Sequence, residues 1–208
     1  MKAVFKHEFS SYFTGLLGYL FTGVILLFAG IFTWVNNFSG KLANFEYALG
    51  GMSFVLLLCV PVLTMRVLAE ERKQKTDQLL YALPLSMTKI ILGKFLAMVA
   101  LLLIPTAIIG VYPLILAGYG NVYLPAAYGA LLAFFLLACA LLALGMFLSS
   151  LAGNPLFSAV LCFGALLLLY LMSDLADFVS GTAGGSLADF AIMAALLGVL
   201  IWRMTKSI

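Results

Sequence analysis

The sequence predicts an all-α polytopic membrane protein with six transmembrane helices, and three observations support this fold class. Hydrophobic residues make up 65% of the 208 residues and charged residues only 9%, whereas an ordinary soluble domain has about 25% charged residues. Several apolar runs reach the roughly 20 residues that a helix needs to cross a bilayer. The runs do not alternate in polarity as membrane β-barrel strands do, so helices are expected to satisfy their backbone groups in lipid.

This composition excludes several classes of protein. A soluble enzyme, a nucleic-acid-binding module or a secreted disulfide scaffold of this length would expose far more apolar surface than a soluble monomer tolerates. Membrane lipid is therefore the expected surrounding, and no nucleic-acid partner is expected. Cys59, Cys139 and Cys162 lie inside apolar runs, where we expect free thiols that pack as small hydrophobic residues.

The first expected element is an amphipathic helix over residues 2–16. Aromatic side chains recur at helical spacing on one side, and basic and hydroxyl side chains fill the other, which suits a helix lying in the inner membrane interface. The alternative is a plain extension of the first span, but Gly15 and Gly18 offer a bend between the two helices. The residues expected to mark this interfacial helix are Phe5, Lys6, Phe9, Tyr12 and Phe13.

Six membrane spans follow from the apolar runs, within a single transmembrane domain over residues 1–208. The first span is too long for the apolar region of a signal peptide. Asn154 and Pro155 are placed to cap and to begin the fifth. The predicted spans are residues 16–35, 48–66, 90–117, 125–148, 155–172 and 187–204.

Small residues four positions apart predict where helices approach closely. The fourth span has two such pairs with glycine, Gly129/Ala133 and Gly145/Ser149. Pairs of this kind serve packing within one chain and dimerisation equally well.

The basic residues predict the orientation of the spans. Ten of the eleven Lys and Arg residues fall at one set of span ends, and Lys41 alone falls at the other. Because basic residues are kept on the cytoplasmic side, both termini are expected in the cytoplasm, which agrees with an even number of spans. The expected location is the cell membrane.

Residues 69–89, between the second and third spans, form the most charged segment of the chain. Glu71 precedes Lys75 by four positions, the favourable order on a helix. A helix is therefore expected at the start of this segment, followed by a leucine-rich stretch that Pro84 ends. The pattern suits a docking surface for a soluble partner, and the alternative is a solvated loop that only fixes topology.

The segment between the fifth and sixth spans, residues 173–186, carries two acidic residues and a cluster of glycines. It lies on the predicted outer side and lacks the Lys and the preceding strand of a phosphate-binding loop. We expect a short re-entrant or interfacial helix followed by a turn.

Residues that enzymes use for catalysis are scarce in this sequence. His7 is the single histidine, no GxxxxGK[ST] motif is present, and the spans lack nucleophile–base pairs. Charges lie at or near span ends, whereas ion-coupled transporters need ionisable groups or broken helices inside the membrane. We expect no catalytic residue, no metal site and no cofactor in this chain, and energy for any transport must come from outside the membrane domain.

Two stretches of the chain resemble a known family. The first runs from Pro61 to Ser86 with a Met-Arg, two acids, basic residues, a Thr, a Leu pair and a Pro, and closes with Leu92-Gly93-Lys94. The second runs from Tyr128 to Leu151. Both are similar to the permease subunits of type-2 ABC (ABC-2) exporters, and the first is most similar to the branch that includes the gliding-motility permease.

The resemblance implies the type-2 ABC exporter fold. This fold has an N-terminal elbow helix, six spans, a coupling helix between the second and third spans, and short outer helices between the fifth and sixth. Such permeases work in pairs, and their coupling helices dock on separate ATPase subunits that bind ATP and Mg. The coupling residues that the resemblance implies are Arg66, Glu70, Glu71, Arg72, Lys73, Thr76, Asp77, Leu79 and Leu80.

We therefore predict the permease subunit of an ABC transporter that works as an exporter and is not itself an enzyme. It would pair with a second permease subunit, identical or different, and with a cytoplasmic ABC ATPase. The alternative is a non-transporting membrane scaffold or assembly subunit that docks a soluble partner through residues 69–89. Aromatic residues in the spans suit a lipid or amphiphile as substrate and equally suit contact with bilayer lipid, so the substrate class stays open.

Overall fold

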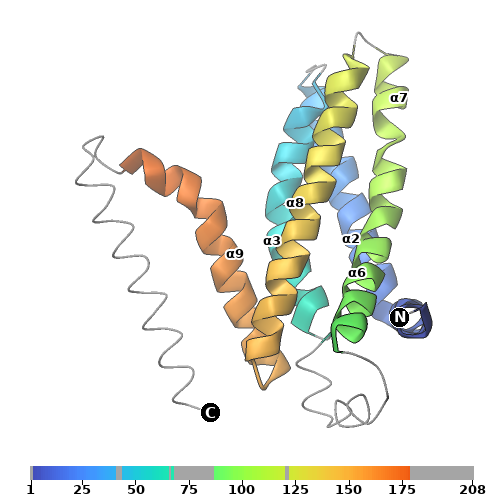
Figure 1. Ribbon diagram of the computed structural model, residues 1–208. Coiled ribbons are helices and arrows are strands. Elements are labelled where there is room, and N and C mark those ends of the chain that lie inside the picture. The colour runs from blue at the N-terminus through green and yellow to red at the C-terminus, as the bar shows by residue number, and fades with distance from the viewer. Residues whose placement is uncertain (1, 41–43, 66, 68–86, 120–121, 179–208) are drawn as a thin grey trace. The chain divides into compact units, whose positions relative to one another are not determined.

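The computed structural model describes residues 2–40, 44–65, 67, 87–119 and 122–178. All regular structure in these ranges is helical (Figure 1). The chain divides into two units, residues 1–166 and 167–208. The helices are α1 (Lys2–Thr14), α2 (Leu16–Thr33), the π-helix η1 (Trp34–Ser39), α3 (Glu46–Met65), α6 (Met87–Ile109), α7 (Tyr112–Ala117), α8 (Leu124–Leu151) and α9 (Pro155–Phe178).

Helices α2, α3, α6 and α8 lie side by side in the first unit (Figure 1). Helix α3 packs most extensively against α8 and α2, and α6 packs against α2 and α8. Apolar side chains fill the space between these helices, and in a membrane their close van der Waals packing, rather than removal from water, holds the helices together. Among the most buried are Met52, Leu56, Leu57, Val60, Leu63, Met98, Leu101, Leu102 and Leu142, each at most 2% exposed.

Five helical segments are long and apolar enough to cross a membrane among the residues described. They are Leu16–Ser39, Glu46–Met65, Thr88–Ala117, Leu124–Leu151 and Pro155–Met172. These correspond to the first five predicted spans, and the sixth, residues 187–204, lies outside the described residues. The all-helical membrane class is thus supported, and the count of six spans stays a prediction.

The third predicted span is interrupted in the structure. Helix α6 ends at Ile109, and α7 begins at Tyr112 with Pro113 in its first turn. A proline lacks the N–H that would continue the helical bonding, so carbonyls before it need other donors. The hydroxyl of Tyr128 on α8 donates to the carbonyl oxygen of Gly110 at 3.2 Å. A neighbouring helix therefore gives one carbonyl at this break a hydrogen-bond donor.

Helix α9 begins as the sequence predicts. The Asn154 side-chain oxygen accepts a hydrogen bond from the backbone N–H of Leu156 at 3.4 Å, and Pro155 occupies the first helical position. The helix extends to Phe178, so the first residues of the segment expected to form a separate outer element, 173–186, continue α9. The described part of the second unit is the end of this helix, residues 167–178.

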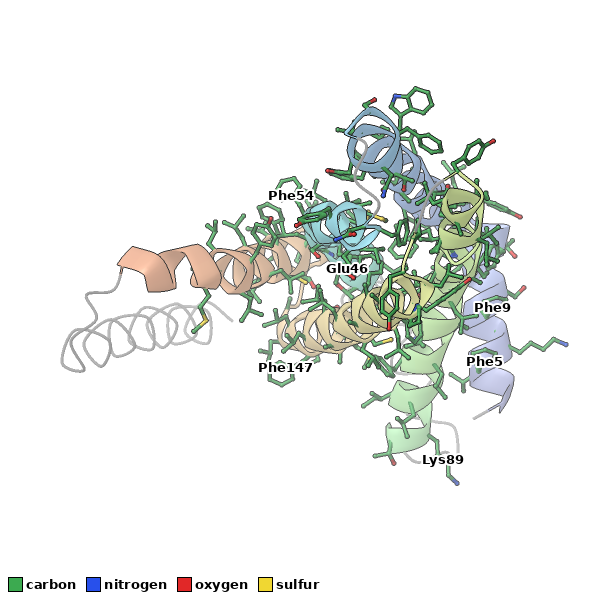
Figure 2. The ribbon with its side chains drawn as sticks, turned by 90° about the horizontal axis from the view of Figure 1, so that it is seen from above. Phe5, Phe9, Glu46, Phe54, Lys89 and Phe147 are labelled. Atoms are coloured by element: carbon green, nitrogen blue, oxygen red, sulfur yellow. The ribbon has the colours of Figure 1, made fainter. Side chains whose placement is uncertain are left out.

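Helix α1 runs crosswise to the bundle. Figure 1 shows it nearly end-on beside the base of α6, and Figure 2 shows it lengthwise with Phe5 and Phe9 labelled. Gly15, in an extended conformation, separates α1 from α2. A Cβ atom on Gly18 would lie 2.6 Å from the carbonyl oxygen of Tyr12, so glycine is what lets the two helices meet at this angle.

Candidate functional site at the junction of α1, α3 and α6

The polar face of α1 is exposed. Every residue on it carries a basic, imidazole or hydroxyl side chain, and together they line an open depression of about 620 Å³. This is the face that the sequence predicts as polar. Its described residues are Lys6, His7, Ser10, Ser11 and Thr14.

The opposite face of α1 carries a row of aromatic side chains. Phe5 and Phe9 stack with ring centroids 5.9 Å apart, and Phe9 and Phe13 lie 5.1 Å apart. Phe13 meets Tyr19 of α2 edge-to-face at 5.5 Å. The row therefore links α1 to the start of α2, and Tyr12 beside it is buried.

Glu8 is the acidic residue on this packed face. It lies one turn before Tyr12, so the two side chains point the same way along α1, and α1 packs against α6. The interfacial residues predicted from sequence did not include Glu8, although its spacing from Phe5, Phe9 and Tyr12 places it among them.

Lys94 of α6 is fully enclosed, with 1% of its side chain exposed. It sits in the buried stripe of α6, one turn after Ile90 and one turn before Ala97 and Met98. The sequence places Lys94 among the basic residues of the predicted cytoplasmic ends and in the Leu92-Gly93-Lys94 motif, and it predicts no partner for this residue. A lysine at a position where the helical period predicts an apolar residue is the signal that could have identified it.

An ion pair joins these two residues. The Lys94 Nζ atom lies 2.7 Å from the Glu8 Oε1 atom, and 22% of the Glu8 side chain is exposed. The same Nζ atom donates to the carbonyl oxygen of Val67 at 3.4 Å. Val67 lies two residues after the end of α3, so the side chain of Lys94 on α6 contacts both α1 and the chain that leaves α3.

This arrangement is stable only while both charges are present. Removing an ammonium from water costs several kcal/mol, and interactions with nearby acceptors must offset this desolvation penalty. The carboxylate and the carbonyl provide them in the charge-assisted geometry expected for such bonds. Lys94 thus fixes α1 and the end of α3 to α6 as long as Glu8 remains in place.

A second polar group lies near the same end of α3 and contains no charge. The Thr64 hydroxyl donates to the carbonyl oxygen of Val60 at 2.9 Å and lies 3.7 Å from the Cys162 sulfur. A Cβ atom on Gly145 of α8 would lie 2.8 Å from the Thr64 methyl group, so the predicted pair Gly145/Ser149 marks a close helix contact. We call Thr64, Gly145, Ser149 and Cys162, all buried, the neutral seam.

The other predicted small pair behaves differently. A Cβ atom on Gly129 would meet nothing within 4 Å, so this glycine is not needed for contacts within the described chain. The three cysteines are free thiols, as predicted.

We call Lys94, Glu8 and the Val67 carbonyl the charged junction. It lies at the two ends of the segment that is expected to dock a partner. Residues 68–86 connect Val67 to Met87, the first residue of α6. The predicted coupling residues Arg66, Glu70, Glu71, Arg72, Lys73, Thr76, Asp77, Leu79 and Leu80 lie outside the described residues. The structure describes Val67 and Met87, the residues on either side of the segment 68–86.

Comparison with protein families decides the class. A family model described as ABC-2 family transporter protein matches residues 4–194 of the chain, a range that includes the junction and the neutral seam. The chain belongs to the ABC-2 transporter family. Searches of curated proteins and of solved structures give no significant match.

Membership explains the composition and the helices described above. This ABC-2 family protein is a multi-pass membrane protein and a permease component of an ABC transporter. The family implies an ABC ATPase subunit as partner and is a transport component rather than a catalytic one. The match identifies the family as a whole, so the resemblance to the gliding-motility branch stays a prediction.

Proposed function

We propose that this ABC-2 family protein is the permease subunit of an exporter that couples ATP hydrolysis in a separate ATPase subunit to movement of a substrate across the cell membrane. The carrying observation is the family match over residues 4–194. The matched range includes all but the first two residues of α1, every later described helix and the charged segment 69–89. A transporter is for this reason favoured over a membrane scaffold that uses the same segment to dock a partner.

The ATPase would dock on the segment between α3 and α6. The proposed coupling residues are those that the resemblance implies, Arg66, Glu70, Glu71, Arg72, Lys73, Thr76, Asp77, Leu79 and Leu80. The partner subunit would bind ATP and Mg. This arrangement requires both chain termini and the 69–89 segment on the cytoplasmic side, which the distribution of basic residues favours.

A second permease subunit, identical or different, would complete the transporter. Among the described residues of the first unit, helix α8 leaves most of its apolar surface uncovered, with 22% of its span residues buried. Lipid covers such surface where no protein does, and close helix packing in a membrane needs small residues. The open glycine Gly129 on α8 offers one such position.

The docking test uses charge reversal. The permease is expressed with candidate ABC ATPases, beginning with any encoded next to it, and purified through a tag on the permease alone. We expect an ATPase to co-purify with the unmodified chain, and Glu70→Lys with Glu71→Lys to lower its recovery at least tenfold by reversing the proposed docking charge.

Glu46→Lys is the matched control. It makes one such charge reversal at an exposed position at the other end of α3, and it should leave recovery unchanged. If no ATPase co-purifies and the double reversal has no effect, the proposal is wrong.

A further inference from the structure

We infer that Lys94 is a positioning residue that carries displacement of the segment 68–86 to helix α1, by holding Glu8 and the Val67 carbonyl on one ammonium group. This inference rests on the proposed function, since the displacement is the one that a docked ATPase would cause. It assigns a role to two residues outside the proposed docking segment.

The first step is the path of the chain. The segment 68–86 leaves α3 at Val67 and returns at Met87. Lys94, two turns into α6, donates back to the Val67 carbonyl at 3.4 Å. The side chain of Lys94 thus links the two ends of the segment, because it lies on α6 and binds the Val67 carbonyl. A force applied to the segment therefore acts on Lys94 from both ends.

The second step is the reach to α1. Glu8 is 86 positions earlier in the sequence, and its Oε1 atom lies 2.7 Å from Lys94 Nζ. Packed apolar helices can slide past one another by small shear movements. A short charge-assisted bond is directional, and an ammonium that is 1% exposed has little water with which to replace a lost partner. The pair therefore makes α1 move with α6.

The third step concerns the other contacts of α1, which would determine its movement if the ion pair were absent. In the described chain α1 also packs against α6, and it connects to α2 through the bend at Gly15 and the aromatic contact of Phe13 with Tyr19. Packing alone permits sliding, so without the ion pair α1 should follow α6 less closely and α2 more closely. This contrast makes the inference measurable.

The experiment measures distances in the whole complex. The permease, with its three cysteines replaced by Ala, is reconstituted with its ATPase in lipid nanodiscs, diluted with unlabelled permease so that one chain is labelled. Spin labels are placed at the exposed residues Ser11 on α1 and Tyr123 at the start of α8, or at Lys89 on α6 and Tyr123. Distances are compared between the nucleotide-free complex and the complex trapped with ATP and vanadate.

In the unmodified sequence we expect both distances to change together on trapping. In Lys94→Met, which keeps an unbranched side chain one heavy atom shorter and removes its charge, the Lys89–Tyr123 change should persist. The Ser11–Tyr123 change should fall by at least half. Lys6→Met removes a charge from the exposed face of α1 and should behave as the unmodified chain.

A purely structural role gives a different result. Lys94→Met would then lower the melting temperature and leave the full Ser11–Tyr123 change, and that outcome overturns the inference. If neither distance changes in the unmodified complex, the proposed function and the inference fail together. If both the Lys89–Tyr123 and the Ser11–Tyr123 distances keep their full change in Lys94→Met, the inference is wrong and the proposed function stands.

Two more variants keep the test decisive if Lys94→Met does not fold. Lys94→Arg keeps a donor for both partners and should retain both changes. Glu8→Lys with Lys94→Glu restores an ion pair between α1 and α6 but places an acceptor opposite the Val67 carbonyl. The two distances should then still change together and by a smaller amount. If α1 stops following α6 in the swapped chain, the ion pair is not the connection.

Discussion

The charged junction, formed by Glu8, Lys94 and the Val67 carbonyl, and the neutral seam both lie at the end of α3, where Val67 and Thr64 are three residues apart. They bury polar atoms in different ways. Beside Val67 the protein buries the charged ammonium group of Lys94, and Glu8 on another helix provides the opposite charge. At Thr64 it buries a hydroxyl that bonds to its own helix, a common device for Ser and Thr in apolar surroundings.

The difference follows from the cost of each group. A charge deep in a bilayer costs about 2.5–3.5 kcal/mol or more, so an ammonium group is kept only where an opposite charge is held beside it. The Glu8 carboxylate is itself partly exposed and lies on the crosswise helix α1. The hydroxyl and thiol of the neutral seam need no such partner, and small residues let the helices close around them. Contacts at the junction should therefore be the more sensitive to substitution.

The largest effect is expected from removing the carboxylate. Glu8→Gln removes the carboxylate that lies 2.7 Å from the enclosed Lys94 ammonium, and breaking a buried ion pair in this way should lower the free energy of unfolding by about 3–5 kcal/mol. Lys94→Met leaves a carboxylate that already reaches solvent, so its loss should be smaller, about 1–3 kcal/mol. Melting temperatures of the purified variants in one detergent measure the difference.

The double variant Glu8→Leu with Lys94→Met is the control for this pair. Replacing both partners by apolar side chains removes the unpaired charge and should recover most of the stability lost in Glu8→Gln. Equal losses for the two single variants would mean that the pair is solvated in the membrane-bound protein, and the contrast with the neutral seam would disappear.

The next effect tests the bend that brings α1 to the junction. The Cβ atom of Gly18→Ala would lie 2.6 Å from the Tyr12 carbonyl oxygen and 3.0 Å from its carbon. Backbone atoms yield only if α1 itself shifts, so we expect a loss of about 1–3 kcal/mol. In the same helix, Gly23→Ala meets nothing within 4 Å and should stabilise by up to about 1 kcal/mol.

Proteolysis of α1 measures the second consequence of this shift. A displaced α1 should be cut faster in Gly18→Ala than in Gly23→Ala at equal protease concentration, because its contacts with α6 are weakened. Equal rates and equal melting temperatures would show that the two helices meet at this angle without needing glycine.

The membrane class and the first five spans could be predicted from the sequence because length and polarity decide whether a helix crosses a bilayer. The break after Ile109 was missed, since the apolar run continues through Gly110 to Ala117 and only Pro113 indicates an interruption. Hydropathy indicates whether a residue lies in lipid or water and is insensitive to such an interruption of the helix.

The junction could be predicted only in part. The position of Lys94 within the helical stripe of α6 indicates burial, and the spacing of Glu8 indicates the packed face of α1. Their pairing depends on how α1 crosses α6, which no local pattern in either segment specifies. The same holds for Gly145, whose small size predicts a contact but whose partner Thr64 is a property of the assembled bundle.

The smallest effect is expected at the neutral seam, where side chains can yield. The Cβ atom of Gly145→Ala would lie 2.8 Å from the Thr64 methyl carbon and 2.9 Å from its hydroxyl oxygen. The gain in helix propensity, up to about 1 kcal/mol, offsets part of an overpacking cost of about 1–3 kcal/mol. Gly129→Ala on the same helix has open space and should show the gain alone.

Thr64→Ala removes both atoms that Gly145→Ala would meet first, so the two substitutions together should be more stable than the sum of their separate effects. A coupling of about 0.5–3 kcal/mol is typical of residues in contact, and melting temperatures of the four proteins in the cycle measure it. Additive effects would place α8 farther from α3 than in the structure. A Gly145→Ala loss exceeding that of Glu8→Gln would reverse the comparison and make tight neutral packing, rather than the buried charge, the more sensitive contact at the end of α3.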